Sequence, residues 1–532
     1  MASNKKSSYD QKRAWRHIDI VKYMFVLYMS SFFLVYMDNK YFNITATRNY
    51  VFLYGVLGLL VLSALAVTVE IFMNNYYGGG PMFSLDCKIP AMPDFWACLF
   101  LVANVCAFLM ATDKAAAYDG SKGRRMGLLM IICLVLSFLI LARKVYVNRI
   151  NLYILAGVTA FAYVLSYLQH FGMDPFDLIR DITQKQKQLF ISTFGNINTF
   201  GSFICVATPL FAAVLIYSKK IDIRIISGVI VIMSSMAMLA SKSDNVYLGI
   251  GTAFLLLLFI SIKDKKLVAY WLSVTLLSLG LFIMTLIKAR YGGSEKHING
   301  IAKLIGDWRI TGALFGACLV VFVILFLLEK MNGEAFGKFQ GRTLMIVLAV
   351  LIVIAGVGLF ILGRKSGKTD LFTFNDKWGT YRGYIWRRLV SIYKESGFLH
   401  KLFGHGNESI AEIMKPYYDE MVSVTGKSYD NAHNEVIHYL LTTGLFGAIS
   451  YIGFFVSSLI FMLRRYKADP VVTAMMAAGV GYFFQGLVNL NQPITTPIFF
   501  TVLGVGVGYI RYRDEGFGIF KETKQNSLKN QV

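Results

Sequence analysis

Long apolar runs dominate this chain and leave few folds open to it. Hydrophobic residues make up 56% of the 532 residues and charged residues only 16%, which is too little polar surface for three or four soluble domains. A helix needs roughly 20 apolar residues to span a bilayer. Runs of about that length begin near residues 18, 51, 92, 126, 151, 200, 223, 245, 267, 310, 342, 436, 469 and 494. The sequence therefore predicts an all-α, polytopic membrane bundle of about 12–14 transmembrane helices.

The basic residues predict which helix ends face the cytoplasm. The formal net charge is +22, and its Lys and Arg residues gather in short segments between apolar runs. That pattern is typical of loops at an anionic membrane face, so we expect no nucleic-acid partner and place both termini in the cytoplasm. One loop disagrees: residues 112–125 would lie outside although they carry Lys114, Lys122, Arg124 and Arg125. Either an early span is miscounted or this loop is an exception.

This topology divides the chain into six regions. They are a basic tail (1–17), an N-terminal transmembrane region (18–190), a transmembrane core (191–363), one large external loop (364–435), C-terminal transmembrane helices (436–511) and a cytoplasmic tail (512–532). Loops as long as the fourth region are usually functional. Two helices on the membrane surface are also predicted, one capped by Thr380 with Ile385 and Leu389 on its apolar face, and one beginning at Asp174-Pro175.

Two polar stretches precede apolar runs in the middle of the chain. Asn196 and Asn198 lie in the stretch 192–200, where they can bind sugar hydroxyls or phosphate oxygens. The alternative is ordinary capping of a membrane helix. Lys242 lies between two serines in the turn 241–245, where it can hold a phosphate, and the alternative is a solvated turn.

Two further clusters belong to the large loop. Arg382 stands among aromatic residues with Arg387 and Arg388, and a guanidinium group binds phosphate or carboxylate through two parallel hydrogen bonds. The alternative is anchoring to lipid headgroups. His433 lies where the loop meets a membrane helix, and a neutral imidazole there can take a proton near physiological pH. A lone histidine, however, is more often structural.

These clusters, taken in order, resemble the O-antigen ligase and O-antigen polymerase superfamily. The family signature is matched by His433-Asn434 with Gly444 eleven residues after the histidine. Thr193–Asn198 is similar to its "TFGNxN" stretch, and Arg382 with Trp386 to its "R…iW" segment. Leu402–Gly406 is similar to the "pLfGxG" stretch that follows. The resemblance covers roughly residues 190–450, and it breaks at the short turn, where Lys242 stands in place of the usual Arg.

The resemblance implies a membrane-embedded, C-type glycosyltransferase that uses neither a metal nor another cofactor. Such an enzyme transfers a glycan from an undecaprenyl-pyrophosphate carrier to a glycan, lipid or protein hydroxyl, on the outer face of the bacterial cytoplasmic membrane. We expect His433 to act as general base or to orient the acceptor, and Arg382 and Lys242 to bind the pyrophosphate. Asn434 is expected to orient the imidazole, and direct displacement to invert the anomeric configuration.

A second hypothesis remains open at this stage. Flippases and exporters of lipid-linked oligosaccharide share a fourteen-span architecture, although the ordered motifs in external loops favour the enzyme. Polymerase and ligase share the motifs, so the sequence does not separate these two activities.

Overall fold

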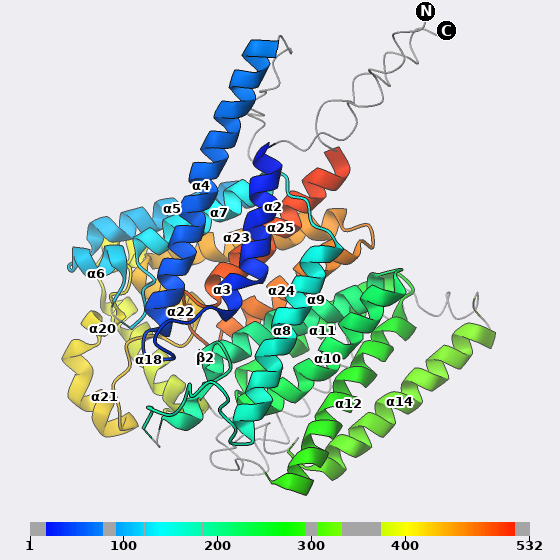
Figure 1. Cartoon of the computed structure of the whole chain (residues 1–532). Coiled ribbons are helices and arrows are strands. Elements are labelled where there is room, and N and C mark those ends of the chain that lie inside the picture. The colour runs from blue at the N-terminus through cyan, green and yellow to red at the C-terminus, as the bar shows by residue number, and fades with distance from the viewer. Residues whose placement is uncertain are drawn as a thin grey trace, which may run out of the picture.

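The computed structural model describes residues 17–77, 92–121, 123–183, 186–292, 306–331, 333 and 374–515, and their apolar runs form helices (Figure 1). Ten helices in these residues are long and apolar enough to cross a membrane. They are α2 with α3 (His17–Ser30 and Phe32–Val35), α4 (Ile44–Tyr77), α5 (Met92–Met110), α8 (Arg149–His170), α9 (Ile197–Tyr217), α10 (Ile221–Ser241), α11 (Asn245–Lys263), α12 (Leu267–Tyr291), α14 (Trp308–Met331) and α23 (Gly444–Arg465).

Three further apolar helices lie at other predicted runs. They are α7 (Leu128–Arg143), α24 (Pro470–Gly486) and α25 (Thr496–Glu515). Each predicted run that falls within the described residues therefore coincides with a helix, whereas the run predicted near residue 342 lies outside them. The prediction of an all-α, polytopic membrane protein is confirmed.

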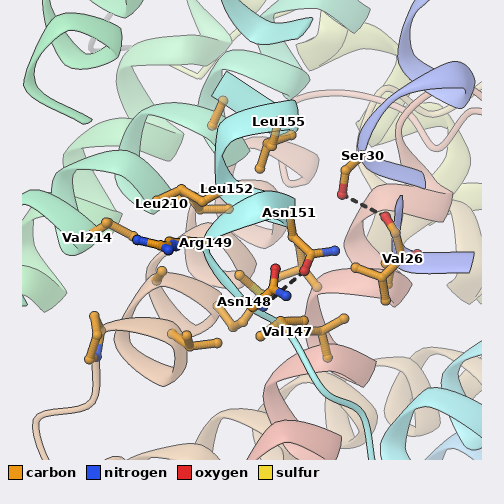
Figure 2. Close-up of a pocket in the computed structure, with 18 of the residues that line it drawn as sticks. Val26, Ser30, Val147, Asn148, Arg149, Asn151, Leu152, Leu155, Leu210 and Val214 are labelled. Carbon is orange, nitrogen blue, oxygen red and sulfur yellow. Dashed lines mark hydrogen bonds between the residues drawn. The ribbon is translucent and has the colours of Figure 1, made fainter. Parts of the chain in front are cut away.

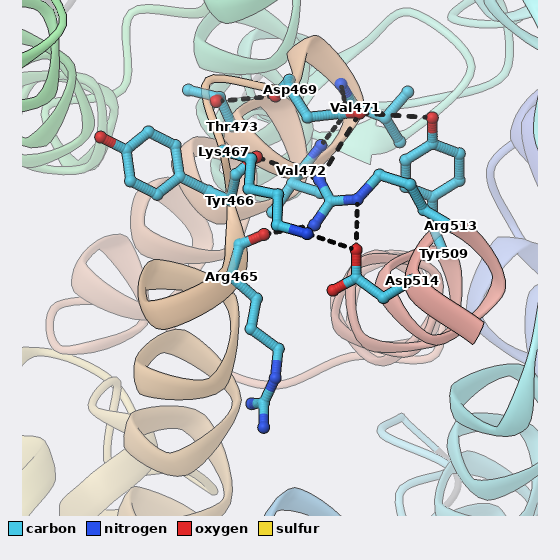
Figure 3. Close-up of polar contacts among 10 residues, drawn as sticks. All are labelled: Arg465, Tyr466, Lys467, Asp469, Val471, Val472, Thr473, Tyr509, Arg513 and Asp514. Carbon is cyan, nitrogen blue, oxygen red and sulfur yellow. Dashed lines mark hydrogen bonds and ion pairs between the residues drawn. The ribbon is translucent and has the colours of Figure 1, made fainter. Parts of the chain in front are cut away.

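The helix ends on one side of the bundle form what we call the basic end. Lys22 donates a 2.7 Å hydrogen bond to the carbonyl oxygen of Lys144, and Arg511 pairs with the buried Asp94 at 2.6 Å. Helix α2 begins and α25 ends at this basic end (Figure 1). Figure 3 shows a second polar group there, in which an arginine and a lysine share one carboxylate: Arg513, Lys467 and Asp514.

The loop of residues 112–125 lies at the opposite end, together with the large loop, and we call this the loop end. Arg124 Nε donates to Asp430 Oδ2 at 3.3 Å, and the Ser121 hydroxyl donates a 3.0 Å hydrogen bond to Glu408. The three spans predicted before this loop are all helical. The structure therefore gives no sign of a miscounted span among these three, and it packs this basic loop against the large loop. Lys122 lies outside the described residues.

Helix α9 forms the centre of the bundle. Its 18-residue apolar window is buried along its whole length, since it packs against α10, α11 and α24. The polar residues Asn196 and Asn198 lie at its loop end, so the fold fixes them on the most enclosed helix of the structure.

One predicted surface helix is absent. Residues 171–183 form turns, although the sequence predicts a helix that begins at Asp174-Pro175. The Asp174 carboxylate caps a turn instead, because it accepts the backbone N–H of Ile179 at 2.7 Å. Phe176 is exposed and Ile182 is buried, so these two side chains do not share one apolar face.

The other predicted helix is present as α18 (Trp378–Glu395), with two differences. Thr380 does not cap it, because residues 379–381 have positive φ and the regular helix follows them. Its buried residues Ile385 and Leu389 also belong to a separate core inside the large loop. Residues of α20 (Ile410–Ile413) and α21 (Tyr418–Thr425) complete that core, and the short elements α19 (Phe398–Phe403) and η2 (Lys415–Tyr417) lie in the same loop. The large loop is therefore a folded unit, not only a membrane-surface segment.

Candidate active site

His433 is held at the end of the large loop, directly before α22 (Glu435–Thr442). Its backbone has φ of +48°, in the left-handed region that costs a side chain energy. The Asn431 Oδ1 atom stabilises this turn by accepting the His433 N–H at 2.9 Å. Asn434 uses its own Oδ1 to cap α22 through the Ile437 N–H at 3.0 Å. Asn431, which the sequence did not single out, is thus the residue that fixes the His433 backbone.

The His433 imidazole is electrically neutral in this setting. Burial and, to a smaller extent, the positive charges of Arg382 and Arg124 together lower its pKa to about 3, although Asp430 opposes them. The ring meets the Tyr429 ring edge to face, with 5.8 Å between centroids. Its Nδ1 atom is buried without a hydrogen-bond partner. A neutral imidazole with an unused ring nitrogen can accept a hydrogen bond or a proton.

Arg382 is the arginine of α18 that acts on His433. Its Nη1 donates to the Gly379 carbonyl oxygen at 3.0 Å, and its Nε is buried without a partner. Burial lowers the pKa of this guanidinium, while Tyr429 and Asp244 counteract that effect. Arg387 and Arg388 differ, because each pairs with an acidic residue of the large loop: Asp376 and Glu420, respectively. The structure thus distinguishes Arg382 from Arg387 and Arg388, although the sequence alone does not.

Two glycines of the family motifs allow two backbones to touch. A Cβ atom on Gly404 would lie 2.2 Å from the Thr442 carbonyl oxygen, and a Cβ on Gly444 would lie 2.3 Å from that of Leu402. A hydrogen bond stabilises this contact: the His405 N–H donates to the Leu441 carbonyl oxygen at 3.0 Å. The "LFGHG" stretch and the glycine after His433 therefore lock the large loop onto the C-terminal end of α22.

The "TFGNIN" stretch is a short hairpin followed by a helix start. Strands β1 (Phe190–Ile191) and β2 (Gly195–Asn196) pair antiparallel, and α9 follows at once. Ser192 and Thr193 are buried, and their hydroxyls donate to the carbonyl oxygens of Ala162 and Leu34 at 2.7 and 2.9 Å. Asn196 caps α9 by accepting the Asn198 N–H at 2.8 Å. The hydroxyls are thus structural, and helix capping is observed for Asn196.

Asn198 joins a buried network of amides that connects three parts of the chain. Its Oδ1 accepts from the Ser243 hydroxyl at 2.6 Å, and its carbonyl oxygen accepts from Asn489 at 3.1 Å. Gln485 Oε1 accepts from Ser202 and Asn489 at 3.0 Å each. The stretch 192–200 and the turn 241–245 therefore lie in contact. Both also contact side chains of α24 and of the segment that follows it.

Lys242 lines a cavity of about 660 Å³ next to the start of α9, which we call the Lys242 cavity. Burial and the positive charge of Lys288 lower the pKa of Lys242. Arg180 and Lys187 also line it, as do Asp174 and Asp177. Asp244, two residues beyond Lys242, acts on Arg382 instead. The turn 241–245 thus lies between a cationic cavity and the His433–Arg382 pair.

Four residues at the loop end were not predicted from the sequence. Arg124 and Glu408 approach the His433 loop, and Gln485 and Asn489 complete the amide network. The basic loop that contradicted the positive-inside rule was the available signal for Arg124, and the polar break at 485–492 was the signal for the amides. Within the described residues, no group of three or more His, Cys, Asp and Glu side chains is arranged to hold a metal ion.

Comparison with known proteins gives one family match for the region that contains the large loop. Residues 304–452 match the family model described as O-Antigen ligase. This part of the chain is therefore similar to the O-antigen ligase superfamily. No curated protein matches it.

The O-antigen ligase match covers only part of the site. It contains Arg382, Trp386, His433 and Gly444, which lie in or next to the large loop. It begins later than the resemblance seen in the sequence, so Lys242 and the two asparagines of α9 lie before it. Their link to the O-antigen ligase region is spatial, through the turn 241–245.

Proposed function

We propose that this membrane protein transfers a glycan from an undecaprenyl-pyrophosphate carrier to a hydroxyl group of a glycan, lipid or protein acceptor, in the synthesis of a cell-surface polysaccharide. The O-antigen ligase family supports a glycosyltransferase-like enzyme with a lipid-linked glycan donor and a glycan acceptor. The observation that carries the proposal is the neutral His433 ring beside the Arg382 cation, at the start of α22. The family match favours this transferase over the exporter that the sequence left open.

The proposed reaction is a direct displacement at the anomeric carbon. The acceptor oxygen forms a bond to that carbon, the bond from the carbon to the pyrophosphate oxygen breaks, and its electron pair leaves with the pyrophosphate. His433 takes the proton of the acceptor hydroxyl, and the anomeric configuration inverts. Bound pyrophosphate carries negative charge close to Arg382, so it raises the pKa of His433 from its low value. The base is thus activated only when the donor is present.

Cationic side chains are proposed to hold the leaving group without a metal ion. A cation about 4 Å from a phosphate charge contributes on the order of 4 kcal/mol at an effective dielectric of 20, before desolvation costs. We assign this role to Arg382 and to Lys242, whose neighbours in the Lys242 cavity include Arg180 and Lys187. Asn196 and Asn198 use their side-chain oxygens within the protein, so their amide nitrogens are the proposed donors to the glycan or to phosphate. Asn434 is proposed to steady the imidazole through its cap of α22.

The proposal includes an orientation of the protein in the bacterial cytoplasmic membrane. We place the basic end and both termini in the cytoplasm, and the loop end with His433 on the external side. The basic loop 112–125 is tolerated there because Arg124 and Arg125 are neutralised by Asp430 and Asp119.

The test measures lipid-linked glycan and surface polymer in cells that carry His433→Ala or Arg382→Ala in place of the wild type. Loss of a general base lowers transfer by about 10²–10⁴-fold, so both variants should accumulate the undecaprenyl-linked donor at an unchanged protein level in the membrane. Matched controls are His400→Ala in α19 and Arg387→Ala in the same helix as Arg382, which should behave as the wild type.

The identity of the accumulated glycan separates the possible activities. Single repeats indicate a polymerase, and long chains indicate a ligase. Surface polymer at the wild-type level in His433→Ala cells would contradict the transferase, and a donor confined to the cytoplasmic leaflet would favour an exporter.

A further inference from the structure

A second large cavity opens at the basic end, away from His433. Its volume is about 710 Å³, within the range of sites that bind small ligands, and we call it the basic-end cavity. Its walls come mainly from α2, α8, α9, α24 and α25, with single residues of α3 and α10, and are mainly apolar (Figure 2). On α9 they run from Phe203 to Val214, a length of roughly 17 Å at 1.5 Å per residue. An apolar slot of this shape suits a hydrocarbon chain that lies along the membrane normal.

The mouth of the basic-end cavity is positively charged. Arg149 at the start of α8 and Lys220 at the start of α10 both line it. Figure 2 shows Arg149 with Asn148 and Asn151 among the apolar side chains of the walls. The Asp222 carboxylate nearby accepts a hydrogen bond from Tyr153, so it offsets part of this charge. The balance remains positive and matches an anionic group.

Two buried donors in the walls lack a partner. Asn151 uses its side-chain oxygen to accept the Asn148 N–H at 3.0 Å, whereas its Nδ2 has no partner. Thr501 Oγ1, on α25, has none either. Both residues are only 7% exposed, and a buried donor without a partner costs about 1–3 kcal/mol. The Asn151 amide lies at the basic end, so the ester or phosphate oxygens of a phospholipid bound there would satisfy it.

The position of the mouth argues against the reacting glycan donor as the occupant. The pyrophosphate of that donor must lie near Arg382 at the loop end, whereas Arg149 and Lys220 lie at the basic end. The two ends of the 21-residue helix α9 are separated by roughly 30 Å. A lipid of the leaflet at the basic end, by contrast, has its headgroup at the level of Arg149 and Lys220.

We propose that the basic-end cavity binds one anionic phospholipid, with an acyl chain along α9 and the phosphate between Arg149 and Lys220. This inference does not depend on the proposed glycosyltransferase activity, because the site is distant from His433 and needs only a bilayer.

The test is native mass spectrometry of the full-length, delipidated protein titrated with phosphatidylglycerol and with phosphatidylcholine of the same acyl chains. The first phosphatidylglycerol should bind more tightly than the first phosphatidylcholine. Each basic residue near a lipid surface contributes about a fivefold factor, so Arg149→Gln with Lys220→Gln should weaken that binding by about thirtyfold. Arg143→Gln with Lys219→Gln is the matched control, since it removes two exposed charges of the same end that do not line the cavity.

A second variant tests the acyl-chain part of the site. Ala474→Phe places a ring in the cavity wall on α24 and should weaken both lipids. Glycerol phosphate, a headgroup without chains, should not compete. Equal affinity for the two lipids, an unchanged affinity in the Arg149→Gln, Lys220→Gln variant, or competition by glycerol phosphate would each overturn the proposal.

Discussion

The indole Nε1 of Trp386 donates a 2.8 Å hydrogen bond to the carbonyl oxygen of Ala432, the residue directly before His433. Trp386 lies four residues after Arg382, so the two side chains share one face of α18. One helix thus carries the cation of the candidate site and also holds the loop that carries His433.

Trp386→Phe should reduce the turnover rate without unfolding the protein. The substitution keeps the aromatic packing and removes one hydrogen bond, worth about 1 kcal/mol, so we expect a drop in kcat of about fivefold. The measurement is the rate of glycan transfer at saturating donor in purified protein. Trp271→Phe in α12, remote from the large loop, is the control; an equal loss in both variants would show that the bond to Ala432 has no special role.

The ion pair between Arg124 and Asp430 should tune His433 in two opposite directions. Arg124 lowers the pKa of His433 and Asp430 raises it. Arg124→Gln removes a positive charge and should move the acid limb of the pH–rate profile to higher pH, whereas Asp430→Asn should move it to lower pH. Both variants also break the same ion pair. Shifts of the same sign would therefore indicate a purely structural role.

Substitutions at Lys242 should separate its charge from its backbone shape. Lys242 has φ of +54°, a conformation that glycine adopts without cost. Lys242→Gly should keep or slightly raise the melting temperature, yet lower transfer by at least tenfold because the cation is lost. Lys242→Arg, which restores the residue usual in the family, should retain activity. A fully active Lys242→Gly variant would remove this residue from the proposed pyrophosphate site.

Glu408 should make the stability of the protein depend on pH. Burial raises the pKa of its carboxyl from 4.5 to about 7, so the folded state favours the protonated acid. That contribution to stability is fully present below about pH 4.5 and is lost as pH rises through about 7. Glu408→Gln, an isostere of the protonated form, should raise the melting temperature at pH 8 and change it little at pH 5. Equal effects at both pH values would contradict this assignment.

The sequence predicts the helices of this protein well, because hydrophobic length is a local signal. A run of about 20 apolar residues has few alternatives to a membrane helix. Each predicted run within the described residues coincides with a helix, and ten helices there are long and apolar enough to cross a membrane. Local signals fail where tertiary contacts compete. Asp174 looks like a helix cap, yet its carboxylate closes a turn, and Thr380 lies in a left-handed bend ahead of the regular part of α18.

The sequence by itself determined the residue types of the candidate site and their order along the chain. It also marked His433 as the histidine that begins a membrane helix after the large loop. Only the tertiary structure decided which of these residues meet. Arg124 approaches Asp430 across 306 residues, and Asn198 finds Asn489 across 291. The ion pair with Asp376 neutralises Arg387, and this pairing distinguishes Arg387 from Arg382. Such pairings depend on how the helices pack, and no local pattern encodes a contact between segments so far apart.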